Sequence, residues 1–84
     1  IEHLGNVKKV YLTGAFAHGM ESPDIEILLI GSEIDTSYLE NIIAKAGNLI
    51  HKNIIYHLMP PLQFSTEYAA VGHEDLLLLW EQNN

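Results

Sequence analysis

The chain has 84 residues and a formal net charge of -7, from four lysines, no arginine and eleven acids. This length excludes a two-domain protein, and the scarcity of cations disfavours binding of nucleic acid or of an anionic membrane surface by this chain alone. Because 48% of the residues are hydrophobic, cysteine is absent and no apolar run reaches the roughly 20 residues of a spanning helix, we expect residues 1–84 to form one soluble, cytoplasmic domain.

The first part of the chain predicts two strands joined through a glycine turn. Residues 7–12 are β-branched or aromatic and come just before Gly14, which indicates a strand that ends in a turn. Residues 15–20 are mostly small and predict one short helical turn. Residues 25–30 are apolar apart from Glu26, a pattern typical of a central strand that is covered on both faces.

The middle of the chain predicts a long helix over residues 37–51. Asp35, Thr36 and Ser37 all offer side chains for its N-cap, and Ser37 with Glu40 has the spacing of a capping box. An apolar stripe is expected to lie on the sheet. Its members are Leu39, Ile42, Ile43, Ala46, Leu49 and Ile50.

The last part predicts one strand and two short helices. Residues 54–59 read as a strand that Pro60 and Pro61 stop. Residues 66–71 suggest a short helix, and residues 76–80 a final one, since leucine favours helices and two acids come just before. The apolar run that ends at Trp80 either fills the core or contacts another chain or domain. The predicted class is α/β (α+β), a small mixed sheet with helices packed on it.

Two acids and a glycine turn form the pattern that points to chemistry. Asp24 and Glu26 are two residues apart, so at the start of a strand both carboxylates project from one face. Such a pair suits Mg²⁺, which bridges carboxylates to substrate phosphates. Gly14 lets a ligand approach the backbone closely, and amides of the following turn can hold phosphate oxygens. In the plainer reading the acids face solvent and Gly14 only forms a turn.

This stretch resembles the signature of the nucleotidyltransferase superfamily with the polymerase-beta-like palm, in its compact form, the minimal nucleotidyltransferases. The matching residues are Gly14-Ala15-Phe16-Ala17-His18-Gly19 and Asp24-Ile25-Glu26. In that family a Gly-Ser turn holds a nucleoside triphosphate, and three acids on strands bind two magnesium ions for nucleotidyl transfer to a hydroxyl. The resemblance therefore implies nucleotide contacts at Gly14, Ala15 and His18, and catalytic metal ligands at Asp24 and Glu26.

The sequence departs from the family pattern at three places. Ala15 stands where the family has serine, and His18 where arginine is common, so the turn lacks a hydroxyl and a permanent cation. Residues 53–57 contain no acid, and His57 is the one candidate ligand on the face of that strand that also presents Asn53. We therefore expect a degenerate member, catalytically weak or inactive, that serves nucleotide or metal binding, or dimerisation. The alternative is an active Mg²⁺-dependent nucleotidyltransferase.

The resemblance also bears on partners. Domains of this kind occur fused to winged-helix DNA-binding domains in bacterial regulators, or paired with small helical proteins in toxin–antitoxin modules. It thus implies a fused or adjacent DNA-binding domain. A homodimer is the alternative, because so short a chain buries little surface and has little stability alone. The chain starts at Ile1 instead of methionine, and we expect it to be part of a longer bacterial regulatory protein.

Overall fold

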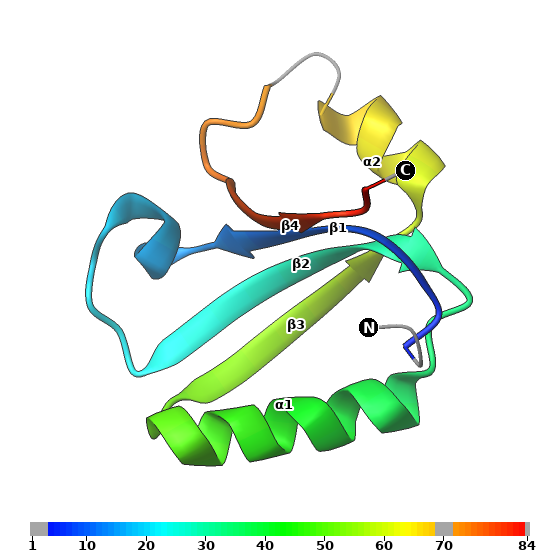
Figure 1. The fold of residues 1–84 in the computed structure, drawn as a ribbon. Helices are drawn as coiled ribbons and strands as arrows, with labels where there is room; N and C mark the ends of the chain where they lie inside the picture. The colour runs from blue at the N-terminus through cyan, green and yellow to red at the C-terminus, as the bar shows by residue number, and fades with distance from the viewer. Residues whose placement is uncertain (1–3, 69–71, 84) are drawn as a thin grey trace.

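The structure is a computed structural model that describes residues 4–68 and 72–83. Its elements in chain order are β1 (Asn6–Thr13), the 3-10 helix η1 (Ala15–His18), β2 (Asp24–Ser32), α1 (Thr36–Ile50), β3 (Asn53–Met59), α2 (Pro61–Tyr68) and β4 (Leu77–Glu81). The three strands, the short turn of helix and the long helix expected in residues 7–59 are therefore confirmed, with small differences at their ends. The arrangement of the elements is shown in Figure 1.

The four strands form one mixed sheet in the order β3-β2-β1-β4. β1 is antiparallel to both β2 and β4, whereas β2 and β3 are parallel because α1 carries the chain back across the sheet between them. The predicted class, a mixed sheet with helices packed on it, is confirmed.

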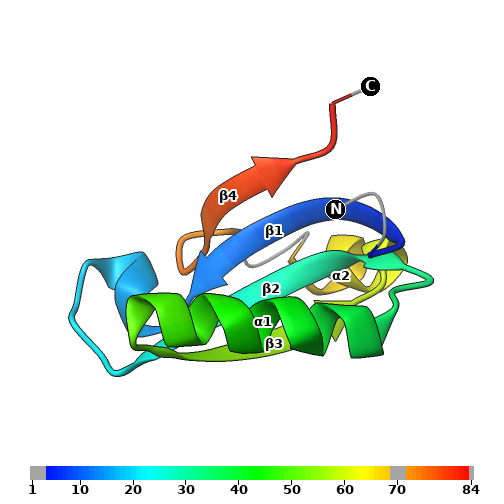
Figure 2. The ribbon, with the colours of Figure 1, turned by 60° about the horizontal axis from the view of Figure 1, so that its bottom comes forward.

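Strand β2 lies between β1 and β3 and contributes to a core on each face of the sheet. Helices α1 and α2 lie on opposite faces of the sheet (Figure 2). The side chains of β2 alternate, so Leu29 packs in the core with Leu39 of α1, while Leu28 and Ile30 pack in the core with Phe64 of α2. The buried residues on the α1 face are Leu4, Val7, Leu29 and Leu39, and those on the α2 face are Tyr11, Leu28, Ile30 and Phe64. Burial on both faces explains why this strand is apolar apart from its first residues.

The N-terminus of α1 differs from the capping box expected in the sequence. Asp35 is the N-cap, and its Oδ1 accepts the backbone N–H of Tyr38 at 3.1 Å. Ser37 is the second residue of the helix and not its N-cap, so the predicted capping box of Ser37 and Glu40 is wrong. Glu40 instead accepts the hydroxyl of Tyr56 at 3.0 Å, and this hydrogen bond to a carboxylate raises the pKa of Tyr56 above its ordinary value.

The apolar stripe of α1 lies only partly on the sheet. Leu39 is buried and Ile43 packs against the same core. Ile42, Leu49 and Ile50 are 38%, 81% and 49% exposed, so the expectation that the whole stripe is covered is wrong. Residues three to four apart share one helical face, and here Leu39 and Ile43 occupy the face that meets the sheet.

The second helix begins earlier than expected. α2 starts at Pro61 instead of residue 66, and a proline suits the first position of a helix because its missing N–H would have no partner there. Of the residues predicted to be helical, 66–68 belong to α2, and 69–71 lie outside the described residues. Phe64 is the buried residue of this helix.

The helix predicted for residues 76–80 is wrong. Residues 77–81 form strand β4, which pairs antiparallel with β1, so that Trp80 lies opposite Val10. Pairing with the open edge of β1 supplies the backbone hydrogen bonds, and this outweighs the helix propensity of leucine. Trp80 packs against the core on the α1 face, while Leu77, Leu78 and Leu79 remain about half exposed.

None of the helices within residues 4–68 and 72–83 has the length and apolar character needed to cross a membrane.

Candidate functional site

The turn after β1 is built around two glycines. Gly14 has φ 72° and ψ -151°, a combination that side chains rarely allow, and it lies just before η1. Gly19 ends η1 in the left-handed conformation, and its N–H donates to the carbonyl of Phe16 at 3.1 Å. The chain thus makes a tight bend at the end of β1, from which Ala15 and His18 are presented.

The two acids lie at the start of β2, and Glu26 is beside this bend. Thr13 pairs with Glu26 across the antiparallel strands, which brings Glu26 next to Gly14. A Cβ atom built on Gly14 would overlap Oε2 of Glu26 and lie 3.2 Å from its Cδ. Asp24 is two residues earlier and projects from the same face of the sheet. Of the two acids, Glu26 lies next to the glycine bend, whereas the side chain of Asp24 contacts Asn53.

Strand β3 adds two polar partners to these acids. Nδ2 of Asn53 donates to Oδ1 of Asp24 at 3.2 Å, and Nε2 of His57 lies 3.5 Å from Oε1 of Glu26. The parallel register explains this, since Asp24 is the Cα partner of Asn53 and the following residues stay in step. Sequence reasoning placed Asn53 and His57 on one face of their strand. Their pairing with the acids depends on the register, which the sequence pattern does not specify.

A lysine that the sequence reasoning did not single out lies next to the bend. Nζ of Lys52 is 3.2 Å from Oε2 of Glu21 and 2.9 Å from the carbonyl of Ser22. It also lies 5.2 Å from the centre of the Phe16 ring in η1. Lys52 therefore lies beside η1, with its charge balanced by Glu21.

His18 points to a different partner. Its Nε2 lies 3.1 Å from Oδ1 of Asp75, in the turn before β4. Both side chains are largely exposed. His18 therefore connects η1 to the turn at residues 72–76, and the structure does not pair it with Asp24 or Glu26.

The acids do not form a complete cation cage. In the described parts of the chain, no three or more histidine, aspartate or glutamate side chains are grouped so that they could hold a metal ion. Two carboxylates on one strand, Asp24 and Glu26, are nevertheless the kind of donor set to which Mg²⁺ binds when water and substrate phosphates complete its coordination.

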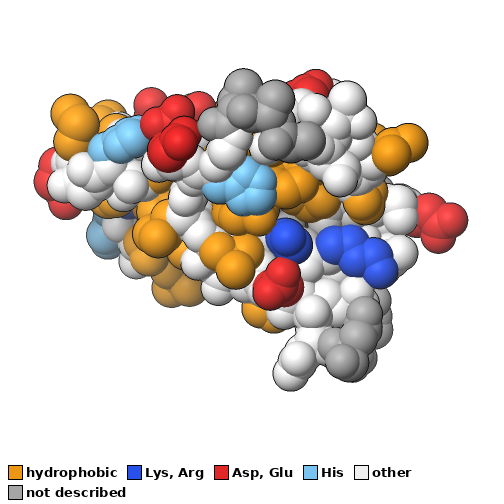
Figure 3. All heavy atoms as spheres, turned by 90° about the horizontal axis from the view of Figure 1, so that it is seen from above, with side chains coloured by type: hydrophobic (Ala, Val, Ile, Leu, Met, Phe, Trp, Pro, Cys, Tyr) orange, Lys and Arg blue, Asp and Glu red, His pale blue; other side chains and the backbone are white. Residues whose placement is uncertain are grey.

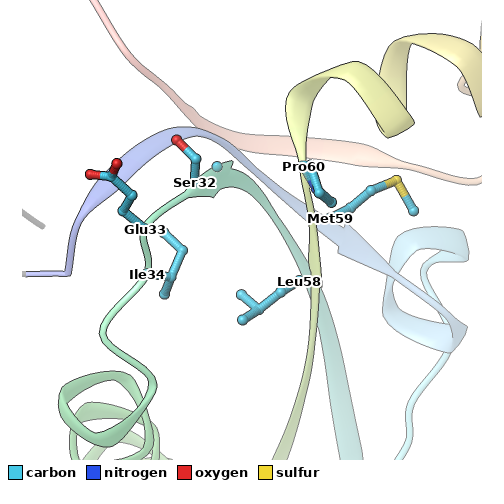
Figure 4. A pocket seen from close by; sticks show the side chains of 7 residues that line it. Ser32, Glu33, Ile34, Leu58, Met59 and Pro60 are labelled. Atoms are coloured by element: carbon cyan, nitrogen blue, oxygen red, sulfur yellow. The ribbon is translucent and has the colours of Figure 1, made fainter.

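A cavity of about 320 Å³ lies at the opposite end of β2 and β3. Its walls come from residues 31–34 and 58–60, and the side chains of Ile34 and Leu58 face each other across it (Figure 4). The lining is mainly apolar, and it includes none of the residues implicated by the sequence.

The comparison with solved structures identifies a similar fold. The chain superposes with a TM-score of 0.63 on a chain described as "Crystal structure of the toxin-antitoxin with AMP-PNP", at 16% sequence identity. The match covers 98% of this chain and 67% of the other. At this identity the likeness shows the fold alone. No protein-family model and no curated protein matches the sequence.

Proposed function

We propose that this chain is a nucleotidyltransferase-like domain that binds a nucleoside triphosphate and a divalent cation at the Gly14 bend, with weak or no transfer activity. The observation that carries the proposal is the contact between Gly14 and the Glu26 carboxylate, with Asp24 on the same face. The similar fold of a toxin–antitoxin chain solved with AMP-PNP supports it.

Charge explains why a cation is needed. A triphosphate beside Asp24 and Glu26 would bring like charges together, and two unit charges about 4 Å apart repel by about 4 kcal/mol at an effective dielectric constant of about 20. Mg²⁺ placed between them reverses the sign of this interaction, because both the carboxylates and the phosphates are ligands that it prefers. Lys52 lies beside the bend but is paired with Glu21, so it does not replace the cation.

Three features support weak catalysis. Ala15 has no hydroxyl for a phosphate, and His18 is engaged with Asp75. Strand β3 places Asn53 and His57 beside the acids and carries no carboxylate of its own. A two-metal mechanism stabilises the attacking and the leaving oxygen together, and two carboxylates are a small set for two ions. We therefore propose one cation, which serves to bind the nucleotide.

A protein context belongs to the same proposal. We infer that this single domain acts within a longer bacterial regulatory protein, as a homodimer or beside a DNA-binding domain. The likeness to a chain from a toxin–antitoxin structure supports a protein partner.

Calorimetric titration tests the binding. A non-hydrolysable ATP analogue should bind in the presence of Mg²⁺ and not with EDTA. Asp24→Asn and Glu26→Gln should each weaken binding by about tenfold or more. Glu33→Gln is the matched control, since it removes the same charge beyond the far end of β2 and should leave binding unchanged.

Two results would overturn this proposal. One is no detectable binding of the Mg²⁺-loaded analogue. The other is tighter binding by Glu26→Gln, which would show that the carboxylate only repels the phosphates. The weak-catalysis half is tested with an α-labelled nucleoside triphosphate: rapid label transfer that Asp24→Asn abolishes would instead establish an active nucleotidyltransferase.

A further inference from the structure

An aromatic cavity of about 270 Å³ lies on the same face of the sheet as Glu26. It is lined by Lys9, Phe64, Ser65, Tyr68 and His73. Figure 3 shows the face that carries α2 and the turn before β4, with histidine and lysine side chains beside hydrophobic ones. None of the residues implicated in the proposed phosphate site lines this cavity.

The rings around the cavity pack against one another. The centroid of the Phe64 ring lies 4.8 Å from that of Tyr68, 5.2 Å from that of His73 and 5.3 Å from that of Tyr11, on which it stacks. The rings of Tyr68 and His73 stand nearly perpendicular, at 78°. Their edges and faces, together with the amino group of Lys9, form an aromatic lining with a few polar groups, which is typical of sites for flat organic ligands.

The cavity is linked to the Gly14 bend in two ways. The centroid of the Tyr11 ring lies 5.3 Å from that of Phe64 and 6.0 Å from that of His73, two residues that line the cavity. Tyr11 is three residues before Gly14, which corresponds to roughly 10 Å of extended chain. The turn before β4 also connects the cavity to η1. His73 of this turn lines the cavity, and Oδ1 of Asp75, two residues later, lies 3.1 Å from Nε2 of His18 in η1. The cavity and the phosphate site are therefore neighbours on one face.

We propose that this cavity binds the aromatic base of the nucleotide whose phosphates lie at the Gly14 bend. The inference rests on the proposed function and adds the site of the base. Base stacking on an aromatic side chain is worth about 1–3 kcal/mol. Ser65 and His73 each offer polar atoms to the edge of the base, while the ammonium of Lys9, 3.5 Å from Glu81, has its charge balanced nearby. A purine is expected to bind better than a pyrimidine, because its stacking surface is larger.

The test compares two ligands that differ in the base. The wild-type chain and Tyr68→Leu are titrated with the Mg²⁺-loaded ATP analogue and with Mg²⁺-loaded inorganic tripolyphosphate. Tyr68→Leu should lower the affinity for the analogue by about 5- to 150-fold and leave the affinity for tripolyphosphate unchanged. Tyr38→Leu, a matched change on α1, should affect neither ligand. Melting curves establish that each variant is folded.

The outcomes separate this inference from the function on which it rests. Two results would overturn the base site while leaving the phosphate site intact. In one, binding of the analogue depends on Glu26 but is unaffected by Tyr68→Leu. In the other, the analogue binds no more tightly than tripolyphosphate. If Tyr68→Leu weakens the analogue while Glu26→Gln does not, the phosphate site is wrong. Binding of neither ligand overturns both.

A second measurement needs no variant. Adenosine, which has no phosphates, is titrated into the ¹⁵N-labelled wild-type chain, and amide shifts are followed by NMR. The expected shifts centre on Phe64, Ser65 and His73. Shifts confined to the apolar cavity at residues 31–34 and 58–60 would overturn the assignment of the base site.

Discussion

Replacing Gly14 with alanine tests the link between the bend after β1 and the acids of β2. The φ and ψ of Gly14, 72° and -151°, lie in a region that is essentially confined to glycine, and forcing a side chain there costs about 1–3 kcal/mol. The new Cβ would also overlap Oε2 of Glu26. This oxygen is at the end of a flexible side chain, so the carboxylate can move away. The overlap is therefore expected to displace the carboxylate and to add little to the loss of stability. We expect Gly14→Ala to lose stability and to displace Glu26.

A matched glycine gives the control. Gly19 has φ 73° and ψ 19°, and a Cβ there meets no atom within 4 Å. Gly19→Ala should therefore cost only about 1 kcal/mol, the penalty of the left-handed conformation. In a domain of this size, 1 kcal/mol shifts the melting temperature by about 4–8 °C. Gly14→Ala should additionally weaken Mg²⁺-dependent binding of the ATP analogue, whereas Gly19→Ala should not.

Urea unfolding of Gly14→Ala, Glu26→Ala and the double variant measures the coupling directly. Residues in contact show interaction energies of about 0.5–3 kcal/mol, whereas independent sites add to within about 0.3–0.5 kcal/mol. We expect an interaction energy above the range for independent sites. Removing the Glu26 carboxylate should partly relieve its overlap with the Cβ introduced at position 14, so the double variant should lose less stability than the sum of the single variants. Additive effects of the two substitutions, with Gly14→Ala no worse than Gly19→Ala, would refute the contact.

Three further predictions concern the fold. Leu29→Ala, in the most buried part of β2, should lower the free energy of unfolding by about 2–5 kcal/mol in urea titrations. Asp35→Ala should cost about 1 kcal/mol because it removes the N-cap of α1, while Ser37→Ala should cost less, and equal losses would contradict the cap assignment. Tyr56→Phe should destabilise the chain at neutral pH, and its difference from wild type should shrink as pH rises through the raised pKa of Tyr56, because ionisation of the phenol ends its donation to Glu40. A pH-independent difference between these two proteins, in melting experiments, would contradict that hydrogen bond.

The sequence is informative where local pattern and tertiary role agree. The continuous apolar run of β2 and the apolar periodicity of α1 identify both elements, because a central strand is covered on both faces and a helix that packs on a sheet is covered on one. The Gly14 bend and the acids of β2 are close in sequence, and pairing of adjacent antiparallel strands brings Glu26 to the glycine. These features could be predicted from residues 7–51.

The sequence is ambiguous where neighbouring elements determine the secondary structure or the contacts of a segment. An apolar run of five residues fits a helix or a strand equally, and the open edge of β1 selects the strand β4. Pro61 can stop a strand or start a helix, and here it starts α2. The contacts of Asn53 and His57 with the acids depend on the parallel register of β2 and β3, in which a shift of one residue would turn both side chains to the other face.

The bulge in β4 has a consequence for how the chain behaves in solution. Val10 pairs with Trp80 and Tyr11 with Leu78, so Leu79 is an inserted residue that bends this outer strand. The strand contains three half-exposed leucines and neither lysine nor proline, a composition that invites further chains to add on and form fibrils. The bend at Leu79 and the repulsion between molecules of net charge -7 are the two features that oppose such polymerisation.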